Sequence, residues 1–278
     1  MPPDMDQVAI TTMITMTTPY RPPMTKPWEI WVKHSRLPRM PEPKTDPLLA
    51  ALHLASPALP VGGFAYSQGL EQAVEDRWVT CMDDAHVWIR DVLLLNLARQ
   101  ELPLWLVCHR ASMAQDWALL RTTNDALLAL RETAEFRLES IQMGHSMAKL
   151  FAQWPGGAAL AQAMQAGLTG DLTASRGAIQ WVYVAAHAAL SAVSGVEETM
   201  ALTAYLWSWV ENQVVAAVKI VPLGQIDGQT LLHRLKGSIS QAIQLALDTP
   251  DQDIGSGALG LAIASCRHES QYSRLFRS

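Results

Sequence analysis

The chain has 278 residues, of which 49% are hydrophobic and 17% charged, and its formal net charge at pH 7 is −5. The apolar fraction excludes a largely disordered chain, and the low charged fraction excludes a solvated coiled coil. The acidic balance argues against a nucleic-acid-binding protein, which needs a basic surface. The three cysteines form no spaced framework, which favours a reducing compartment over secretion.

The N-terminal residues differ in composition from the rest of the chain. Ten of the sixteen prolines lie within the first 47 residues. Because proline fixes φ and removes a backbone donor, we expect no long helix there and predict a poorly ordered tail over residues 1–45. Both a recruiting arm and a plain extension would have this composition. Acidic residues stand where a signal peptide would carry basic ones, so no export signal is expected.

From Asp46 onward the pattern is helical. Asp46 followed by Pro47 is a helix start signal, Ala and Leu dominate, and no alternating strand pattern occurs. We therefore predict an all-α fold with one domain of about ten helices over residues 46–278, with the six later prolines between helices or at their edges. The predicted helices are Pro47–Ala55, Ser67–Asp76, Met82–Arg99, Leu104–Met113, Asp116–Arg131, Ala134–Trp154, Ala158–Gly167, Ser175–Val193, Gly195–Val221 and Gly224–Leu247, with a short one near Ala258–Ser265.

One stretch imitates a membrane span. Residues 177–196 carry no Asp, Glu, Lys or Arg over about the length that a bilayer requires. Four polar side chains in this stretch fall on one stripe of a helix, namely Gln180, His187, Ser191 and Ser194. A single polar stripe among alanines is typical of a helix buried among other helices. We therefore predict a protein that does not associate with a membrane.

The residues that could carry chemistry form no strong site. No two of the eight histidines are three or four residues apart, so we predict no tightly bound metal or other cofactor, although ligands shared with a second chain stay open. The run Ala65-x-Ser67-x-Gly69 resembles a nucleophile elbow, but the prolines and glycines before it make a poor strand. Ser67 is better explained as a helix N-cap. An α-helical serine hydrolase using Ser67 is the alternative function.

A charge cluster stands out in a chain that is otherwise sparing of charge. It consists of Arg131, Glu132, Glu135, Arg137 and Glu139. Arg131 and Glu135 are expected to pair along one helical row, and Glu135 and Glu139 share a face. The cluster is either a solvated face or a docking surface, and composition does not separate the two.

A turn follows the predicted helix Gly195–Val221. Lys219 lies in the last turn of this helix, where its charge complements the helix dipole, and Pro222 stops the helix. Gly224 and Gly228 permit the close approach of another segment. The simplest explanation is a helix–helix turn, and the alternative is a turn that faces a partner.

The C-terminal end is rich in arginine and aromatic side chains, which commonly anchor interfaces. We expect Tyr272–Ser278 to be solvent-accessible in the isolated protein and to become ordered on a partner. Arg274 and Arg277 offer planar donors to carboxylates, and Leu275 and Phe276 offer apolar anchors. On this expectation, removing the last five residues leaves the melting temperature unchanged. The alternative is that Phe276 packs back on its own core.

Four segments, taken in order, resemble the family of the urease accessory protein UreF. They are Leu54–Glu71, Arg131–Gly144, Val218–Gln225 and His268–Phe276. The likeness runs from about Pro47 to Ser278, and four long motifs in order make it specific. One small departure is Gly62-Gly63-Phe64, where the family usually has Gly-Ala-Phe.

The resemblance implies a cytoplasmic, all-α homodimer that acts as an assembly factor and not as an enzyme. Members of the family bridge UreD, also called UreH, and the UreG GTPase on apo-urease, so that nickel and a carbamylated lysine are installed. UreG hydrolyses GTP, this chain would gate that step, and nickel would be present only in transit. The residues expected to contact partners are Tyr66, Ser67, Glu71, Arg131, Glu135, Lys219, Gln225, Tyr272, Arg274, Leu275, Phe276 and Arg277.

Overall fold

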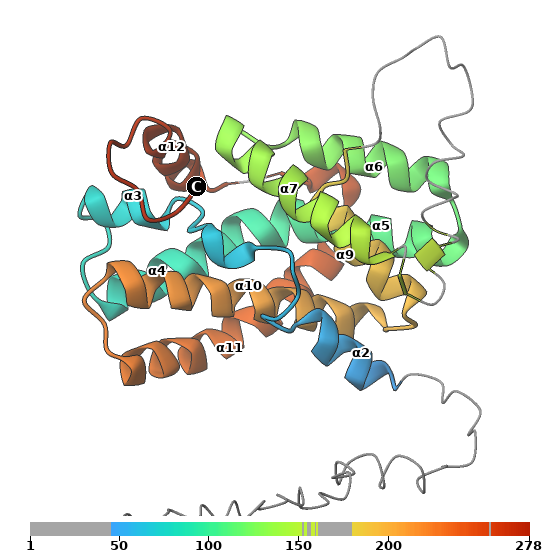
Figure 1. The fold of residues 1–278 in the computed structure, drawn as a ribbon, viewed down its shortest axis with the longest axis horizontal. Coiled ribbons are helices and arrows are strands. Elements are labelled where there is room, and N and C mark those ends of the chain that lie inside the picture. The colour runs from blue at the N-terminus through green and yellow to red at the C-terminus, as the bar shows by residue number, and fades with distance from the viewer. Residues whose placement is uncertain (1–45, 152, 155–156, 159, 161–179, 256) are drawn as a thin grey trace, which may run out of the picture. The chain divides into compact units, whose positions relative to one another are not determined.

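Helices joined by short connections build the described part of the chain, which contains no strand (Figure 1). The computed structural model describes residues 46–278 apart from 152, 155–156, 159, 161–179 and 256. The all-α prediction is confirmed. The predicted N-terminal tail, most of the predicted helix Ala158–Gly167 and the beginning of Ser175–Val193 lie outside the described residues.

The described residues contain ten α-helices, two short 3-10 helices and one π-helix. The α-helices are α2 (Pro47–Leu54), α3 (Leu70–Glu75), α4 (Met82–Val92), α5 (Leu102–Ala114), α6 (Trp117–Ala129), α7 (Ala134–Phe151), α9 (Tyr183–Val193), α10 (Glu198–Ile220), α11 (Gln225–Asp248) and α12 (Leu259–His268). Single 3-10 turns form η1 (Gly63–Ala65) and η3 (Asp251–Asp253), and η2 (Leu93–Glu101) is a π-helix.

Two helices begin directly after a capping aspartate, and the cap at Asp46 was predicted from the sequence. The Asp46 side chain accepts a hydrogen bond of 2.9 Å from the Leu48 N–H, and Pro47 is the first residue of α2. Asp116 accepts a hydrogen bond of 3.0 Å from the Leu119 N–H at the start of α6. Each side chain satisfies an amide that has no partner within its helix.

Helix α3 begins three residues later than predicted. Gln68 and Gly69 have φ of +51° and +78°, which is left-handed backbone and cannot belong to an α-helix. Helix α3 therefore starts at Leu70. Ser67 still has a capping role, because its Oγ accepts a hydrogen bond of 3.2 Å from the Glu71 N–H.

Pro103 does not separate two helices, contrary to the prediction. It lies inside one continuous helical run formed by α4, η2 and α5. Because proline has no N–H, the carbonyl of Arg99 loses its α-helical partner, and the widened π-helix accommodates the ring. The loop before α12 supplies a donor in its place: the Gly255 N–H lies 3.1 Å from the Arg99 oxygen, and the Gly257 N–H of the same loop lies 2.9 Å from the Leu95 oxygen.

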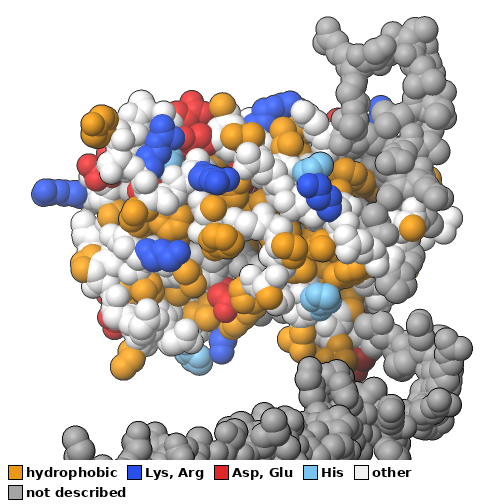
Figure 2. Space-filling view, viewed as in Figure 1, with side chains coloured by type: hydrophobic (Ala, Val, Ile, Leu, Met, Phe, Trp, Pro, Cys, Tyr) orange, Lys and Arg blue, Asp and Glu red, His pale blue; other side chains and the backbone are white. Residues whose placement is uncertain are grey.

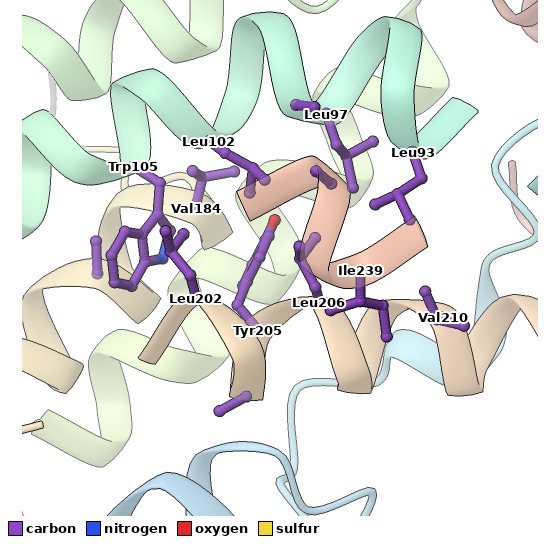
Figure 3. Close-up of a cluster of buried hydrophobic side chains, with 14 of the residues drawn as sticks. Leu93, Leu97, Leu102, Trp105, Val184, Leu202, Tyr205, Leu206, Val210 and Ile239 are labelled. Carbon is purple, nitrogen blue, oxygen red and sulfur yellow. The ribbon is translucent and has the colours of Figure 1, made fainter. Parts of the chain in front are cut away.

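The core forms where η2, α5, α9, α10 and α11 meet. Figure 3 shows side chains from all five elements pointing into one cluster, among them Leu97, Trp105, Val184, Leu206 and Ile239. All five are buried. Burial of this apolar surface is the main favourable term that holds the helices together.

Helix α9 is a buried internal helix and much shorter than the uncharged stretch that suggested a membrane span. His187 and Ser191 on its polar stripe are fully buried, Ser194 is half-buried, and Gln180 is exposed before the helix begins. Burial lowers the pKa of His187 to about 3, so its imidazole is neutral at pH 7. Among the described residues, no helix is long and apolar enough to cross a bilayer.

Glycines set two close helix contacts. A Cβ on Gly228 of α11 would lie 2.7 Å from Val218 Cγ2 of α10, as expected for a position that permits close approach. Gly224 was expected to do the same, but a Cβ there would meet only Asp227 of its own helix. The tightest position is Gly144 of α7, where a Cβ would collide with the backbone carbonyl of Trp181, just before α9.

The contact at Gly144 gives a test of the packing between α7 and α9. Gly144→Ala should lower the free energy of unfolding by about 2–3 kcal/mol, because the added methyl group meets backbone that cannot yield easily. Gly237→Ala in α11 is the matched control, since a Cβ there would have open space around it. That control should stabilise the protein by up to about 1 kcal/mol through helix propensity. Denaturant unfolding of the two variants measures the difference, and equal stabilities would contradict this packing.

Candidate functional site

The C-terminal residues return to the loop that precedes α3. We call residues 269–278 the C-terminal strap. The carbonyl oxygen of Ser278 accepts hydrogen bonds from the backbone N–H and the hydroxyl of Ser67, at 2.9 and 2.6 Å. The Arg277 N–H donates to the Ala65 carbonyl at 2.9 Å. In Figure 1 the strap leaves α12 and ends beside α3.

Glu71 holds the middle of the strap. Its carboxylate accepts hydrogen bonds from the backbone N–H groups of Leu275 and Phe276, at 2.7 and 2.9 Å. Only 7% of Glu71 is exposed. A buried carboxylate is costly unless donors surround it, so these two amides stabilise Glu71 as much as Glu71 orders the strap.

Glu135 holds the start of the strap. One carboxylate oxygen accepts a hydrogen bond of 2.5 Å from Arg274, and the other lies 2.6 Å from His268 Nδ1. The second ring nitrogen of His268, which is fully buried, lies 3.4 Å from Glu71. Glu135 therefore pairs with the strap and not with Arg131, which corrects the predicted ion pair. Glu135 and Glu139 both face the strap, consistent with their shared helical face.

Arg131 lies just before α7 and belongs to a buried network. Its guanidinium pairs with Glu101 of η2 at 2.7 Å, and the Tyr205 hydroxyl donates to the same carboxylate at 2.5 Å. The Arg131 side chain is 16% exposed and Glu139 is 5% exposed. The interpretation of this cluster as a solvated face is therefore wrong for both residues.

Glu139 holds the end of the strap. Its carboxylate accepts hydrogen bonds from Gln68 Nε2 at 2.5 Å and from the Ser278 hydroxyl at 2.7 Å. The side-chain oxygen Oε1 of Gln68 in turn accepts a hydrogen bond of 2.6 Å from Trp209 Nε1 of α10. Burial raises the pKa of Glu139 to about 7, against the hydrogen bonds that favour its ionised form.

Three more of the predicted site residues are Tyr66, Lys219 and Gln225, and they differ in burial and in their contacts. Tyr66 is buried, and its hydroxyl donates to the Gln142 side chain at 2.7 Å. The Lys219 ammonium group lies 5.5 Å from the centre of the Phe276 ring, within the range of a cation–π contact. Gln225 is exposed at the first residue of α11.

The strap is only partly accessible, which corrects the expectation for Tyr272–Ser278. Phe276 and Ser278 are 6% and 1% exposed, so the alternative that Phe276 packs back on the body of the protein is the one observed. Tyr272 and Leu275 are 104% and 74% exposed. The backbone bonds of the strap to Glu71 fix which of its side chains point inward and which point outward.

Ser67 is not a nucleophile. It is fully buried, and its hydroxyl proton is committed to the Ser278 carbonyl. A nucleophile elbow needs an exposed hydroxyl and a base that takes its proton. The alternative of a serine hydrolase is therefore wrong. In the described residues no group of three or more His, Cys, Asp or Glu side chains is placed to hold a metal ion.

Six residues of this arrangement were not among the predicted site residues. They are Gln68, Glu101, Glu139, Tyr205, His268 and Ser278. Gln68, Glu139 and His268 lie within the four segments that carry the family resemblance, and that position was a usable signal. Glu101 and Tyr205 lie outside those segments and had none. Together the fold and the site define an all-helical protein whose buried polar side chains fasten its own C-terminal strap.

Comparisons with known proteins identify the family to which the chain is similar. The UreF family model matches residues 79–236. Proteins named "Urease accessory protein UreF" are similar over most of their length. The one from Cupriavidus necator is 46% identical over 235 residues, which is 83% of this chain and 97% of that protein. The one from Alcanivorax borkumensis is 42% identical over 225 residues, 81% and 95% of the two chains, and the one from Azoarcus sp. is 44% identical over 242 residues, 84% and 96%.

The chain belongs to the UreF family of urease accessory proteins. The members of this family are assembly factors and not enzymes.

The buried carboxylate of Glu139 gives a pH-dependent test. In the unfolded chain this group ionises near 4.5, and in the folded protein near 7, so the unfolded state binds fewer protons between these values. The free energy of unfolding should therefore fall as pH rises from 4.5 to 7 and stay reduced above 7. The wild-type free energy of unfolding should fall by an amount on the order of 2–3 kcal/mol between pH 5 and pH 8 because of Glu139, and Glu139→Gln should abolish this fall.

Denaturant unfolding at both pH values measures this loss, with the exposed Glu132→Gln as control. A Glu139→Gln variant with the same pH dependence as the wild type would refute the assignment.

Removal of the end of the strap gives a second test, and its expected result differs from the unchanged melting temperature that the sequence suggested. Deleting residues 274–278 should lower the free energy of unfolding by about 2–4 kcal/mol, because Phe276 loses its burial and Glu71 loses both amide donors. Thermal unfolding measures this directly. Tyr272→Ala is the control, since a fully exposed side chain should change stability by no more than about 0.5 kcal/mol. A deletion that melts like the wild type would show that the strap is not part of the fold.

Proposed function

We propose that this chain is a nickel-insertion chaperone that bridges UreD and the UreG GTPase on apo-urease and gates GTP-dependent nickel delivery. The observation that carries the proposal is the strap, which the carboxylates of Glu71, Glu135 and Glu139 hold in place while Tyr272 and Leu275 stay exposed. A protein that only holds other proteins together needs an exposed binding surface of this kind and needs no catalytic group. The shared name of its relatives, urease accessory protein, supports the same role.

The outward face of the strap has the chemistry of a binding surface. Tyr272 is fully exposed and Leu275 is 74% exposed, and Arg277 is exposed beside them, whereas the guanidinium of Arg274 is paired with Glu135. Tyrosine and arginine are enriched among residues that dominate binding energy, and exposed apolar side chains favour being covered. On the face shown in Figure 2, apolar side chains lie interspersed with lysines and arginines. Lys219 is exposed next to the strap and extends this surface.

We propose a division of labour among the three proteins. UreG would hydrolyse GTP, and this chain would hold UreG and UreD in register and release them only when the complex is complete. Nickel would pass through the assembly as cargo, with no cofactor held by this chain.

We further propose a cytoplasmic homodimer. Helix α2 carries Leu48, Leu49 and Leu52, which are 53%, 61% and 59% exposed. Three exposed leucines on eight residues make an apolar patch that a second copy of the chain would cover. All three cysteines are unpaired, which suits a reducing compartment.

The bridging role predicts a separation of stability from binding. A Tyr272→Ala/Leu275→Ala double variant should unfold within about 0.5 kcal/mol of the wild type, because both side chains are exposed. It should nevertheless lose co-purification with UreD and UreG and fail to support urease activation. Leu259→Ala on α12 is the matched control, since Leu259 is 72% exposed and lies outside the strap. Full complex formation by the double variant would refute a role of the strap in binding these partners.

A further inference from the structure

A cavity of about 320 Å³ lies between the loop before α3, η2, α7 and α10. Leu59, Val61 and Met143 are among its apolar wall residues. Phe64 and Val215 also line it and are 67% and 43% exposed, so the cavity opens to the surface beside them.

The charged groups that line this cavity do not balance. They are three carboxylates, Glu101, Glu139 and Glu211, and one guanidinium, Arg131. Arg131 is paired with Glu101. Glu139 and Glu211 have no ion-pair partner among the described residues, so two negative charges are uncompensated when both groups are ionised. The cavity is therefore complementary to a cation.

Three residues that line the cavity also carry a buried polar atom without a hydrogen-bond partner. Among the described residues, the side-chain oxygen Oδ1 of Asn96 and the hydroxyl of Ser140 have no hydrogen-bond partner, although these residues are only 8% and 5% exposed. Buried polar atoms are rarely left unsatisfied, and both atoms can accept a hydrogen bond from an ammonium or guanidinium group. The Nε–H of Arg131 is also unpartnered, and it needs one acceptor, which a bridging water would supply.

The lining also indicates which kind of cation fits. It contains no histidine and no cysteine, the ligands that softer transition metals prefer. Its walls are largely apolar, which suits an aliphatic stem and not the hydration shell of a small metal ion. We propose that the cavity binds the side chain of a lysine or arginine from a partner protein, with the stem against the apolar walls and the head group between Glu139 and Glu211. This inference rests on the proposed function only in requiring a partner protein.

Ionisation of Glu139 should tune this binding. The groups that face Glu139 are Arg131, Glu101 and Tyr66, besides its two hydrogen-bond donors. Because burial holds the pKa of Glu139 at about 7, the carboxyl group gains its negative charge as pH rises through neutrality. A cationic ligand should therefore bind more tightly at pH 8 than at pH 6.

Small probes test the cavity without any partner protein. The full-length chain is titrated with n-butylguanidinium chloride, with neutral N-butylurea of similar shape, and with butyrate, and binding is followed by NMR. The guanidinium probe should bind saturably, at least tenfold more tightly than either comparison probe and severalfold more tightly at pH 8 than at pH 6. Glu211→Gln and Glu139→Gln should each weaken its binding at pH 8 about fivefold or more, whereas Glu132→Gln should leave it unchanged.

The outcomes separate this inference from the proposed function. Equal binding of N-butylurea, no saturable binding of the guanidinium probe, or wild-type affinity in the Glu211→Gln variant would overturn it. Glu211→Gln is informative even if Glu139→Gln disturbs the strap, because Glu211 is half-buried and has no ion-pair partner among the described residues. If the Tyr272→Ala/Leu275→Ala variant still binds UreD and UreG, the role of the strap in binding these partners fails, while the probe result is unaffected.

Discussion

The position of the C-terminal strap depends on one interaction, the pair of hydrogen bonds that the Glu71 carboxylate accepts from the amides of Leu275 and Phe276. A carboxylate that is almost wholly buried costs several kcal/mol unless donors compensate it. Among the described residues, the two amide donors to Glu71 come from the strap, some two hundred residues further along the chain, and His268 Nε2 lies 3.4 Å from the same carboxylate. Burial of Glu71 and order in the strap therefore require each other.

The same hydrogen bonds determine which side chains of the strap reach the surface. Once the backbone of the strap is fixed, Phe276 must point inward against Lys219, and Leu275 must point outward. The same carboxylate-and-donor logic repeats at Glu135 and Glu139, so the strap is held along its length. A binding surface built in this way is ordered before a partner binds, which lowers the conformational-entropy cost of association.

The sequence predicts much of the fold because its signals are local. Asp46 and Asp116 are caps, and the helices they start lie where expected. The errors arise where a distant residue decides the outcome. Pro103 has the character of a helix breaker, yet the amides of a loop 150 residues away accommodate it within a π-helix. The same holds for Arg131, because no helical spacing relates it to its partner Glu101. The family motifs mark the segments that meet at the strap, but they do not say which carboxylate meets which donor.

Amide hydrogen exchange at Leu275 and Phe276 in the isolated full-length protein tests this account most directly. If the Glu71 carboxylate holds both amides, they should exchange much more slowly than the amide of exposed Tyr272, and Glu71→Gln should speed their exchange. Rapid exchange at Leu275 and Phe276 in the wild-type protein, at the rate of an unstructured terminus, would contradict it.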